Sequence, residues 1–149
     1  MTALHVRRAT IADLDALAPL FDSYRVFYGK ASDLAAARAF LHARIRSGES
    51  TVFVALLSED AVGFTQLYPG FSSVSMAPIQ VLNDLFVSDA GRRQGVGAAL
   101  LAAAIDFARA AGSVRLALST ARTNIAAQAL YESTGWTRDE EYLTYEYTL

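Results

Sequence analysis

The stretch from residue 79 to residue 111 constrains the fold more than any other part of this 149-residue chain. It opens with an apolar, strand-like run, IQVLNDLFV, at 79–87, followed shortly by the turn RRQGVG at 92–97. The hydrophobic period then changes from two to about 3.6 residues, which predicts a helix from Val96 to Ala111. Because this helix is apolar around most of its girth, we expect it to lie buried against a sheet.

The rest of the chain supplies partners for such a sheet. The strand at 114–119 completes a βαβ unit with the strand at 79–87, and 58–60 reads as a hairpin turn. Further strands are expected at 4–8, 51–57, 61–68 and 141–149, further helices at about 11–27 (capped by Thr10), 33–46 and 124–134, and a polar loop at 69–78. This order predicts an α/β fold: a mixed, mostly antiparallel sheet with a central βαβ unit and helices on both faces. No linker or repeat divides the sequence, so we expect a single domain over 1–149.

Composition excludes several classes of function. With 53% hydrophobic and 19% charged residues, the chain is too apolar for disorder, and its net charge of −2 with scattered arginines predicts no nucleic-acid partner. The absence of cysteine removes disulfides, thiolate zinc sites and a cysteine nucleophile. His5 and His42 lack a metal-ligand spacing, so no metal is expected. No signal-like or membrane-length apolar run is present, which predicts a cytoplasmic protein with no membrane partner.

The glycine turn has the chemistry of a phosphate site. The first turn of a helix presents unpaired N–H groups and a partial positive charge, both of which suit a pyrophosphate. Gly95 and Gly97 would let phosphates approach the backbone, and Arg92 and Arg93 add formal charge. The turn lacks the Gly-Lys-Ser/Thr ending of a Walker A loop, and Leu100 breaks the dinucleotide pattern. By itself, such a turn can also be a simple entry into a helix.

Three motifs in order give the turn a context: LNDLFV at 82–87, RRQGVG at 92–97, and N-x6-Y-E-S-x-G-W from Asn124 to Trp136. Together they resemble the GNAT superfamily of N-acetyltransferases over nearly the whole chain. The wording of the first and last motifs is similar to a branch of small-amine and histone-tail acetyltransferases.

The resemblance implies acetyl-CoA as cosubstrate. In this family the strand before the turn splays from its neighbour, and its main chain pairs with the pantetheine arm, a role that falls on Leu85, Phe86 and Val87. The pyrophosphate would lie on the amides after the leading residue Arg92, those of Arg93, Gln94, Gly95, Val96, Gly97 and Ala98. Asn124 would also contact the cofactor.

The resemblance makes Tyr131 the candidate acid. In the family this tyrosine stands near the thioester sulfur, where its hydroxyl can protonate the departing thiolate. Asn124 and Tyr131 are seven residues apart, which places them about 20° from the same helix face, so a single site can contact both. The alternative for Tyr131 is an ordinary core or interface residue.

The base is open between two residues and water. Many relatives have Glu at the position of Asn83, which cannot accept a proton, although its carbonyl could orient a water. Asp84 is ionisable, but strand alternation points it to the opposite face unless a bulge intervenes. Otherwise Asp84 is a structural residue that holds the loop.

The acceptor site is the least determined. Family topology makes five aromatic residues possible walls of the site: Tyr24, Tyr28, Tyr68, Phe71 and Tyr142. The acidic run at 139–141 would suit a cationic amine, such as a polyamine or a lysine side chain, or it is a solvated turn. The expected C-terminal strand is apolar and aromatic enough to pair across subunits, so a homodimer is one expectation. We therefore predict direct acetyl transfer to a primary amine, with a non-catalytic CoA-binding regulatory module and an unrelated nucleotide-binding protein as alternatives.

Overall fold

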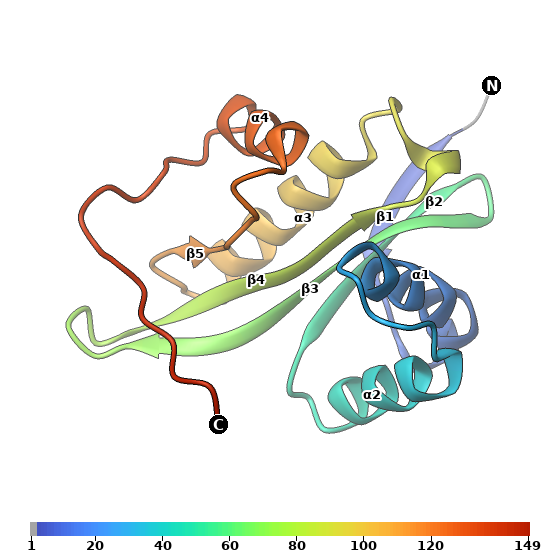
Figure 1. Ribbon diagram of the computed structural model, residues 1–149, viewed down its shortest axis with the longest axis horizontal. Helices are drawn as coiled ribbons and strands as arrows, with labels where there is room; N and C mark the ends of the chain where they lie inside the picture. The colour runs from blue at the N-terminus through green and yellow to red at the C-terminus, as the bar shows by residue number, and fades with distance from the viewer. Residues whose placement is uncertain (1–2) are drawn as a thin grey trace. The chain divides into compact units, whose positions relative to one another are not determined.

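The computed structural model describes residues 3–149, which form two compact units that meet in sequence at Ser119 and Thr120. The second unit contains one helix, α4 (Ile125–Ser133). The first unit contains the other elements: β1 (Leu4–Arg8), η1 (Ile11–Asp13), α1 (Leu14–Phe27), α2 (Leu34–Arg46), β2 (Thr51–Leu57), β3 (Asp60–Ser72), β4 (Ala77–Val87), η2 (Asp89–Gly91), α3 (Val96–Ala110) and β5 (Leu116–Ala117) (Figure 1).

The five strands form one sheet in the order β1-β2-β3-β4-β5 (Figure 1). The first four pair antiparallel, and β5 returns parallel to β4 after the crossover through α3. This crossover is the predicted βαβ unit, and the predicted mixed, mostly antiparallel sheet is confirmed.

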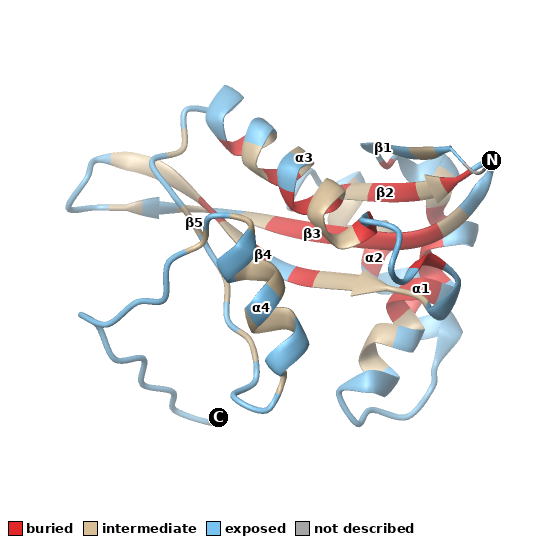
Figure 2. Cartoon of the chain, turned by 90° about the horizontal axis from the view of Figure 1, so that it is seen from above, coloured by how far each residue is buried: buried red, intermediate tan, exposed pale blue. Residues whose placement is uncertain are grey.

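Helices cover both faces of this sheet, as the strand alternation requires. On β2, Val54 packs in one apolar cluster with residues of α1 and α2, whereas its neighbour Ala55 packs in a second cluster with Val96 and Leu100 of α3. Buried residues therefore run through β2 and β3 between the helix layers (Figure 2).

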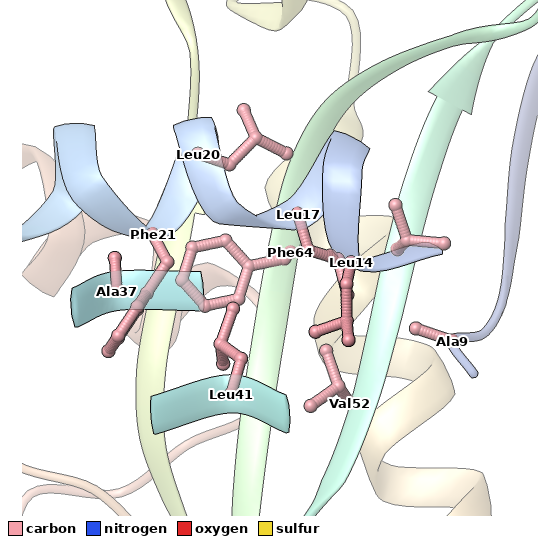
Figure 3. Close-up of a cluster of buried hydrophobic side chains, with 10 residues drawn as sticks. Ala9, Leu14, Leu17, Leu20, Phe21, Ala37, Leu41, Val52 and Phe64 are labelled. Atoms are coloured by element: carbon pink, nitrogen blue, oxygen red, sulfur yellow. The ribbon is translucent and has the colours of Figure 1, made fainter. Parts of the chain in front are cut away.

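The larger cluster lies under α1 and α2 and is centred on the aromatic ring of Phe64 (Figure 3). Phe64, Leu17 and Leu41 are each 0% exposed, and the ring of Phe21 meets that of Phe64 edge-on at 6.0 Å. Truncation of such a buried aromatic typically costs about 3–5 kcal/mol. The cluster thus fixes α1 against β3, and α1 carries part of the site described below.

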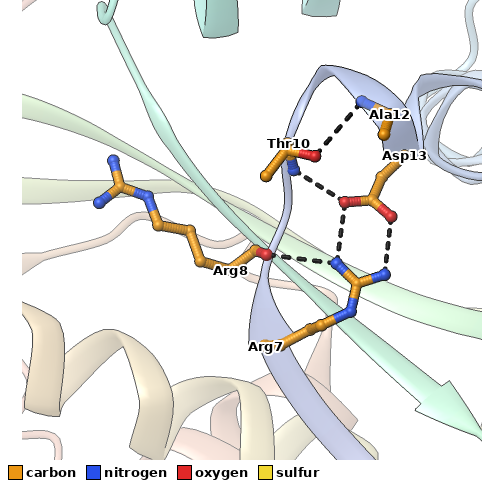
Figure 4. A network of polar contacts seen from close by, with 5 residues as sticks. All are labelled: Arg7, Arg8, Thr10, Ala12 and Asp13. Atoms are coloured by element: carbon orange, nitrogen blue, oxygen red, sulfur yellow. Dashed lines mark hydrogen bonds and ion pairs between the residues drawn. The ribbon is translucent and has the colours of Figure 1, made fainter.

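The start of the first helix is held by a capping box and an ion pair (Figure 4). The Ala12 amide donates to the Thr10 hydroxyl at 3.3 Å, and the Thr10 amide donates to the Asp13 carboxylate at 2.8 Å. Arg7 donates to both Asp13 oxygens, at 2.9 and 2.7 Å, and this contact lowers the pKa of Asp13. The predicted cap at Thr10 is confirmed, although the first turn after it is a 3-10 turn.

The loop predicted at 69–78 is wrong. β3 continues to Ser72 and β4 begins at Ala77, so only 73–76 form the turn. Pro69 and Pro78 lie within the ladder, paired with Gln80 and Phe71. Because proline has no N–H to donate, its presence in a sequence is evidence against a strand. A strand can still contain proline at a position where no hydrogen-bond donor is needed.

The last two strands expected along the sequence also differ from prediction. The strand expected at 114–119 is reduced to Leu116–Ala117. The strand expected at 141–149 is wrong, because the structure assigns this stretch no strand and leaves its alternating large residues exposed: Tyr142, Leu143, Tyr145, Tyr147 and Leu149. Alternating apolar and polar residues show which face a strand would bury. A strand also needs a neighbouring strand to pair with. The single domain over 1–149 stays a prediction.

Candidate active site

A bulge in β4 separates the two candidate base residues. Gln66 of β3 pairs with Asp84, and the next residue, Leu67, pairs with Leu82, so Asn83 is the extra residue on β4. Asn83 is exposed, whereas Asp84 is 5% exposed. A bulge of this kind re-aims side chains. Asp84 lies in register with Gln66 of β3 and Val52 of β2, and Val52 belongs to the cluster under α1 and α2.

The Asp84 carboxyl is held by a chain of buried polar side chains. The Gln66 amide nitrogen donates to Asp84 Oδ2 at 2.6 Å, and the Gln66 carbonyl oxygen accepts from the Ser50 hydroxyl at 2.8 Å. Burial raises the pKa of Asp84, opposed by hydrogen bonds from Gln66 and Tyr24. The same chain links Asp84 to Ser50 in the loop before β2, so a structural role for Asp84 stays the alternative. A buried carboxyl with a raised pKa is a candidate general base.

Two of the predicted acceptor tyrosines lie beside Asp84, and a third adjoins them. The Tyr24 hydroxyl donates to the Asn83 carbonyl at 3.2 Å, and the Tyr28 ring packs edge-on against Tyr24 at 5.1 Å. Burial, followed by the nearby charge of Asp84, raises the pKa of Tyr68 to about 12. Tyr24, Tyr28 and Tyr68 therefore gather near Asp84. Phe71 is not part of this group. It is 82% exposed and lies near the end of the β3–β4 hairpin.

Beyond Asp84, one edge of β4 is unpaired with any strand of the described chain. β5 pairs with β4 only at Gln80 and Val81, so Leu85, Phe86 and Val87 face no strand on that side. Their side chains nevertheless pack in the two apolar clusters, Phe86 with the α1–α2 cluster and the other two with the α3 cluster. The main-chain groups that these residues present to that edge, away from β3, can therefore pair with an extended ligand.

The glycine turn follows directly. Arg93 and Gly95 have positive φ angles, +61° and +75°, and a Cβ added at Gly95 would meet nothing within 4 Å. The Ala99 amide makes the first bond of α3, to the Gly95 carbonyl at 3.0 Å, so the amides of Val96, Gly97 and Ala98 precede the helical hydrogen bonds. An open backbone with unused amides at a helix start fits an anionic phosphate.

The side chains of this turn mostly serve the turn itself. Gln94 donates to the Ala90 carbonyl at 2.9 Å, and Arg92 pairs with Asp89 at 2.9 Å in an exposed contact. Exposed pairs of this type are weak, so a phosphate can compete for Arg92.

Two glycines outside the predicted motif let the turn sit close to the sheet. A Cβ at Gly63 would lie 2.9 Å from the Phe86 carbonyl oxygen and 3.0 Å from a Val96 methyl, and one at Gly91 would lie 2.9 Å from Val62. Sequence reasoning missed both, together with Gln66. The available signal for Gln66 was a polar residue in the middle of an apolar strand, AVGFTQLY.

The second unit contains the remaining candidates. Asn124 is the N-cap of α4, where its side-chain oxygen accepts from the Ala127 amide at 3.1 Å. Tyr131 lies within α4, and its ring approaches that of Trp136 at 6.1 Å. Tyr142 is 77% exposed after the helix. The structure gives these three residues no position relative to the first unit.

Comparison with known proteins decides the family. A model described as the acetyltransferase (GNAT) family matches residues 17–136. The chain belongs to the acetyltransferase (GNAT) family. It is 46% identical over 142 residues, 95% of each chain, to a Bacillus subtilis (strain 168) protein named uncharacterized N-acetyltransferase YhfO. It is 33% identical over 138 residues, 92% of each chain, to a probable acetyltransferase of Haemophilus influenzae. A crystal structure of a probable acetyltransferase superposes with a TM-score of 0.92 at 42% identity, covering 97% of each chain.

The GNAT assignment makes this chain an acetyltransferase, and an unrelated nucleotide-binding fold is excluded. Its free β4 edge and open glycine turn fit an elongated, phosphate-bearing cosubstrate. Among residues 3–149, no group of three or more His, Cys, Asp or Glu side chains could hold a metal ion. Within the same range, no helix has the length and hydrophobicity needed to cross a membrane.

Proposed function

We propose that this GNAT acetyltransferase moves the acetyl group of acetyl-CoA to a primary amine by direct attack within a ternary complex. The observation that supports this most is the order of features along one strand and its turn. The bulge and buried carboxyl come first, the free main-chain edge second, and the open helix start third. A proton acceptor, a binding edge for an extended arm and a phosphate cradle thus follow one another along the chain.

Asp84 is the proposed base. A protonated amine must lose a proton before its nitrogen can attack, and a carboxylate with a raised pKa accepts a proton near neutral pH better than an ordinary one. Because Asp84 is only 5% exposed, we place a water between the amine and the carboxylate. The exposed Asn83 cannot accept this proton, and its part is to carry the bulge and to orient that water through its side-chain carbonyl.

The cosubstrate would lie along β4 and the turn. The amides of the β4 edge would bind the pantetheine arm and polarise the thioester carbonyl, and the amides at 93–98 would bind the pyrophosphate together with Arg92. The neutral amine attacks the thioester carbon, the C–N bond forms and the C–S bond breaks. Tyr131 gives its phenolic proton to the leaving thiolate. The second proton lost from nitrogen restores the Tyr131 phenol through water, and the proton taken up by Asp84 returns to solvent. Asn124 contributes to cofactor binding in this proposal.

We propose a cationic acceptor, either a small amine such as a polyamine or a lysine-like side chain. The carboxylate of Asp84 and the rings of Tyr24, Tyr28 and Tyr68 provide charge and aromatic faces that attract an ammonium group. The wording of the motifs LNDLFV and YESTGW, which resembles a small-amine and histone-tail branch, is consistent with this class. Phe71 and Tyr142 remain weaker candidates as walls. A cytoplasmic homodimer is the assembly and location that we propose.

An acceptor screen tests the proposal. Purified protein with acetyl-CoA is offered polyamines, lysine peptides, aminoglycosides and amino acids, while free thiol and acetylated product are both measured. We expect equal amounts of thiol and acetyl-amine with cationic primary amines. Tight acetyl-CoA binding without turnover on any amine would instead indicate the non-catalytic CoA-binding module.

A further inference from the structure

The side chain next to Asp84 on β3 is as buried as any in the molecule. Gln66 is 0% exposed, yet it is polar and sits in a strand whose neighbours, Phe64 and Leu67, are fully buried and apolar. Burying an amide costs free energy unless its hydrogen bonds are satisfied. A glutamine at such a place needs a reason that an aliphatic residue of similar volume would not meet.

The two bonds of Gln66 define its orientation. Its carbonyl oxygen accepts from the Ser50 hydroxyl at 2.8 Å. A hydroxyl can donate or accept and would suit either end of the amide, whereas a carboxylate can only accept and therefore selects the nitrogen. The nitrogen is therefore turned toward Asp84 Oδ2, 2.6 Å away. A donor at this distance favours a carboxylate over a carboxylic acid, which would present a competing proton.

We propose that Gln66, held by Ser50, is a positioning residue for acetyl transfer that fixes the Asp84 carboxyl and keeps it in its charged, proton-accepting form. This inference rests on the proposed role of Asp84 as base. Gln66 itself touches neither substrate nor cofactor in this account.

The surroundings of Asp84 give Gln66 this role. From α1, the Tyr24 hydroxyl makes a hydrogen bond that lowers the pKa of Asp84, and on β3 the charge of Asp84 acts on Tyr68. The charged side chains near Tyr68 are Arg44, at the end of α2, and Glu49. These two pair with each other at 2.9 Å. Burial, which favours the uncharged acid, is thus opposed first by Gln66 and second by Tyr24.

The direct test is the pKa of Asp84, measured by 13C NMR of the labelled aspartate carboxyl and assigned by loss of the signal in Asp84→Asn. Gln66→Met keeps the length of the side chain and removes the donor, so the pKa of Asp84 should rise by about one to two pH units. Ser50→Ala removes the hydrogen bond that holds the Gln66 carbonyl and should raise the pKa of Asp84 by less. Thr65→Val is the matched control, because the Thr65 hydroxyl is equally buried but donates to the Asp84 main-chain carbonyl at 2.7 Å. That variant should leave the pKa of the carboxyl in place.

A second readout separates positioning from simple structural support. The acidic limb of kcat/KM should move to higher pH in Gln66→Met by the same amount as the NMR pKa, with activity recovering at higher pH. A folded Gln66→Met protein whose Asp84 titrates as in the wild type overturns the proposal. If that variant does not fold, an unchanged pKa in Ser50→Ala overturns it equally. Full activity of Asp84→Asn would instead remove the base from the proposed function, whatever the NMR pKa of Asp84 does in the Gln66 variant.

Discussion

At the scale of single residues, burial of the Asp84 carboxylate lowers the stability of the fold, while the same carboxylate is the proposed base. Its folded pKa is raised mainly by burial, so its contribution to folding is fully present in acid and is lost as the pH rises through that pKa. A neutral amide of the same shape avoids this loss. A residue that weakens the fold at neutral pH has the signature of a functional site.

Asp84→Asn should therefore be more stable than the wild type at neutral pH. At pH values above the folded pKa of Asp84, we expect the melting temperature of the variant to exceed that of the wild type by about a few degrees. The difference should vanish in acid, near the ordinary pKa range of a carboxyl group. Thermal unfolding followed by circular dichroism from acid to neutral pH measures this. A variant that is less stable at every pH would show that the carboxylate is held for structure.

Tyr131→Phe tests the proposed acid. Removing the phenolic hydroxyl should lower kcat by about 10²-fold or more while leaving the Kd of acetyl-CoA nearly unchanged, because the ring still packs near Trp136. Steady-state kinetics and calorimetry together give the two values. Unchanged turnover would remove Tyr131 from the acid role.

How well individual residues could be predicted depended on whether their signal was local. Gly95 can be identified because a helix start after a strand is visible in the sequence, and its φ of +75° lies in the left-handed region that favours glycine. Asp84 was left open because its direction depends on a bulge, which strand alternation cannot reveal. Gln66 was missed because its importance comes from pairing with Asp84 across the ladder, 18 residues away in sequence.

At the scale of elements, the glycine turn and α3 act as one unit. The N-terminus of α3 is held on the sheet by Val96, which is 1% exposed, and by the absence of a side chain at Gly63. The open backbone at Gly95 therefore has a fixed position beside the free edge of β4.

Gly95→Glu should abolish acetyl-CoA binding, because its carboxylate would occupy the space and oppose the charge of the pyrophosphate. Gly112→Glu is a matched control: Gly112 follows the same helix, has a φ of +77°, and also has nothing within 4 Å of an added Cβ. Both variants carry the same backbone strain, about 1–2 kcal/mol. Calorimetry should show binding lost only at position 95, and retention of binding there would mean that the turn is not the cradle.

Helices were predicted correctly where the hydrophobic period and an N-cap residue agreed. Strands were predicted wrongly where their extent depended on pairing with another strand. The helices at 14–27 and 96–110 follow clear apolar stripes, and the Thr10 cap marks the start of the first. The 3-10 turn at Ile11–Asp13 depends on local backbone geometry. The length of the β3–β4 hairpin depends on strand pairing that continues through two prolines. The sequence pattern at 141–149 is that of a strand, but no ladder in the described chain receives it.

At the scale of the whole molecule, the exposed C-terminal side chains bear on assembly. Tyr145, Tyr147 and Leu149 are all exposed, three large apolar groups within five residues. If the proposed homodimer buries them, deletion of residues 141–149 should convert a dimer into a monomer. Light scattering coupled to size exclusion would show this, and a wild-type protein that is monomeric at micromolar concentration would contradict the homodimer.

The mixed sheet, the helices on both faces and the acetyltransferase family follow from sequence patterns that span the chain. What sequence could not supply is the chemistry at the centre, where burial, a bulge and a cross-strand glutamine together define one carboxyl. The proposed mechanism therefore depends most on whether that carboxyl takes part in the transfer.

The most direct measurement is the pH dependence of kcat/KM for acetyl transfer to a cationic amine, compared between wild type and Asp84→Asn. We predict an acidic limb in the wild type at the NMR pKa of Asp84. In Asp84→Asn we predict a kcat/KM about 10²- to 10⁴-fold lower above that limb, and no limb at that pH. An Asp84→Asn enzyme with the rate and pH profile of the wild type would contradict the account.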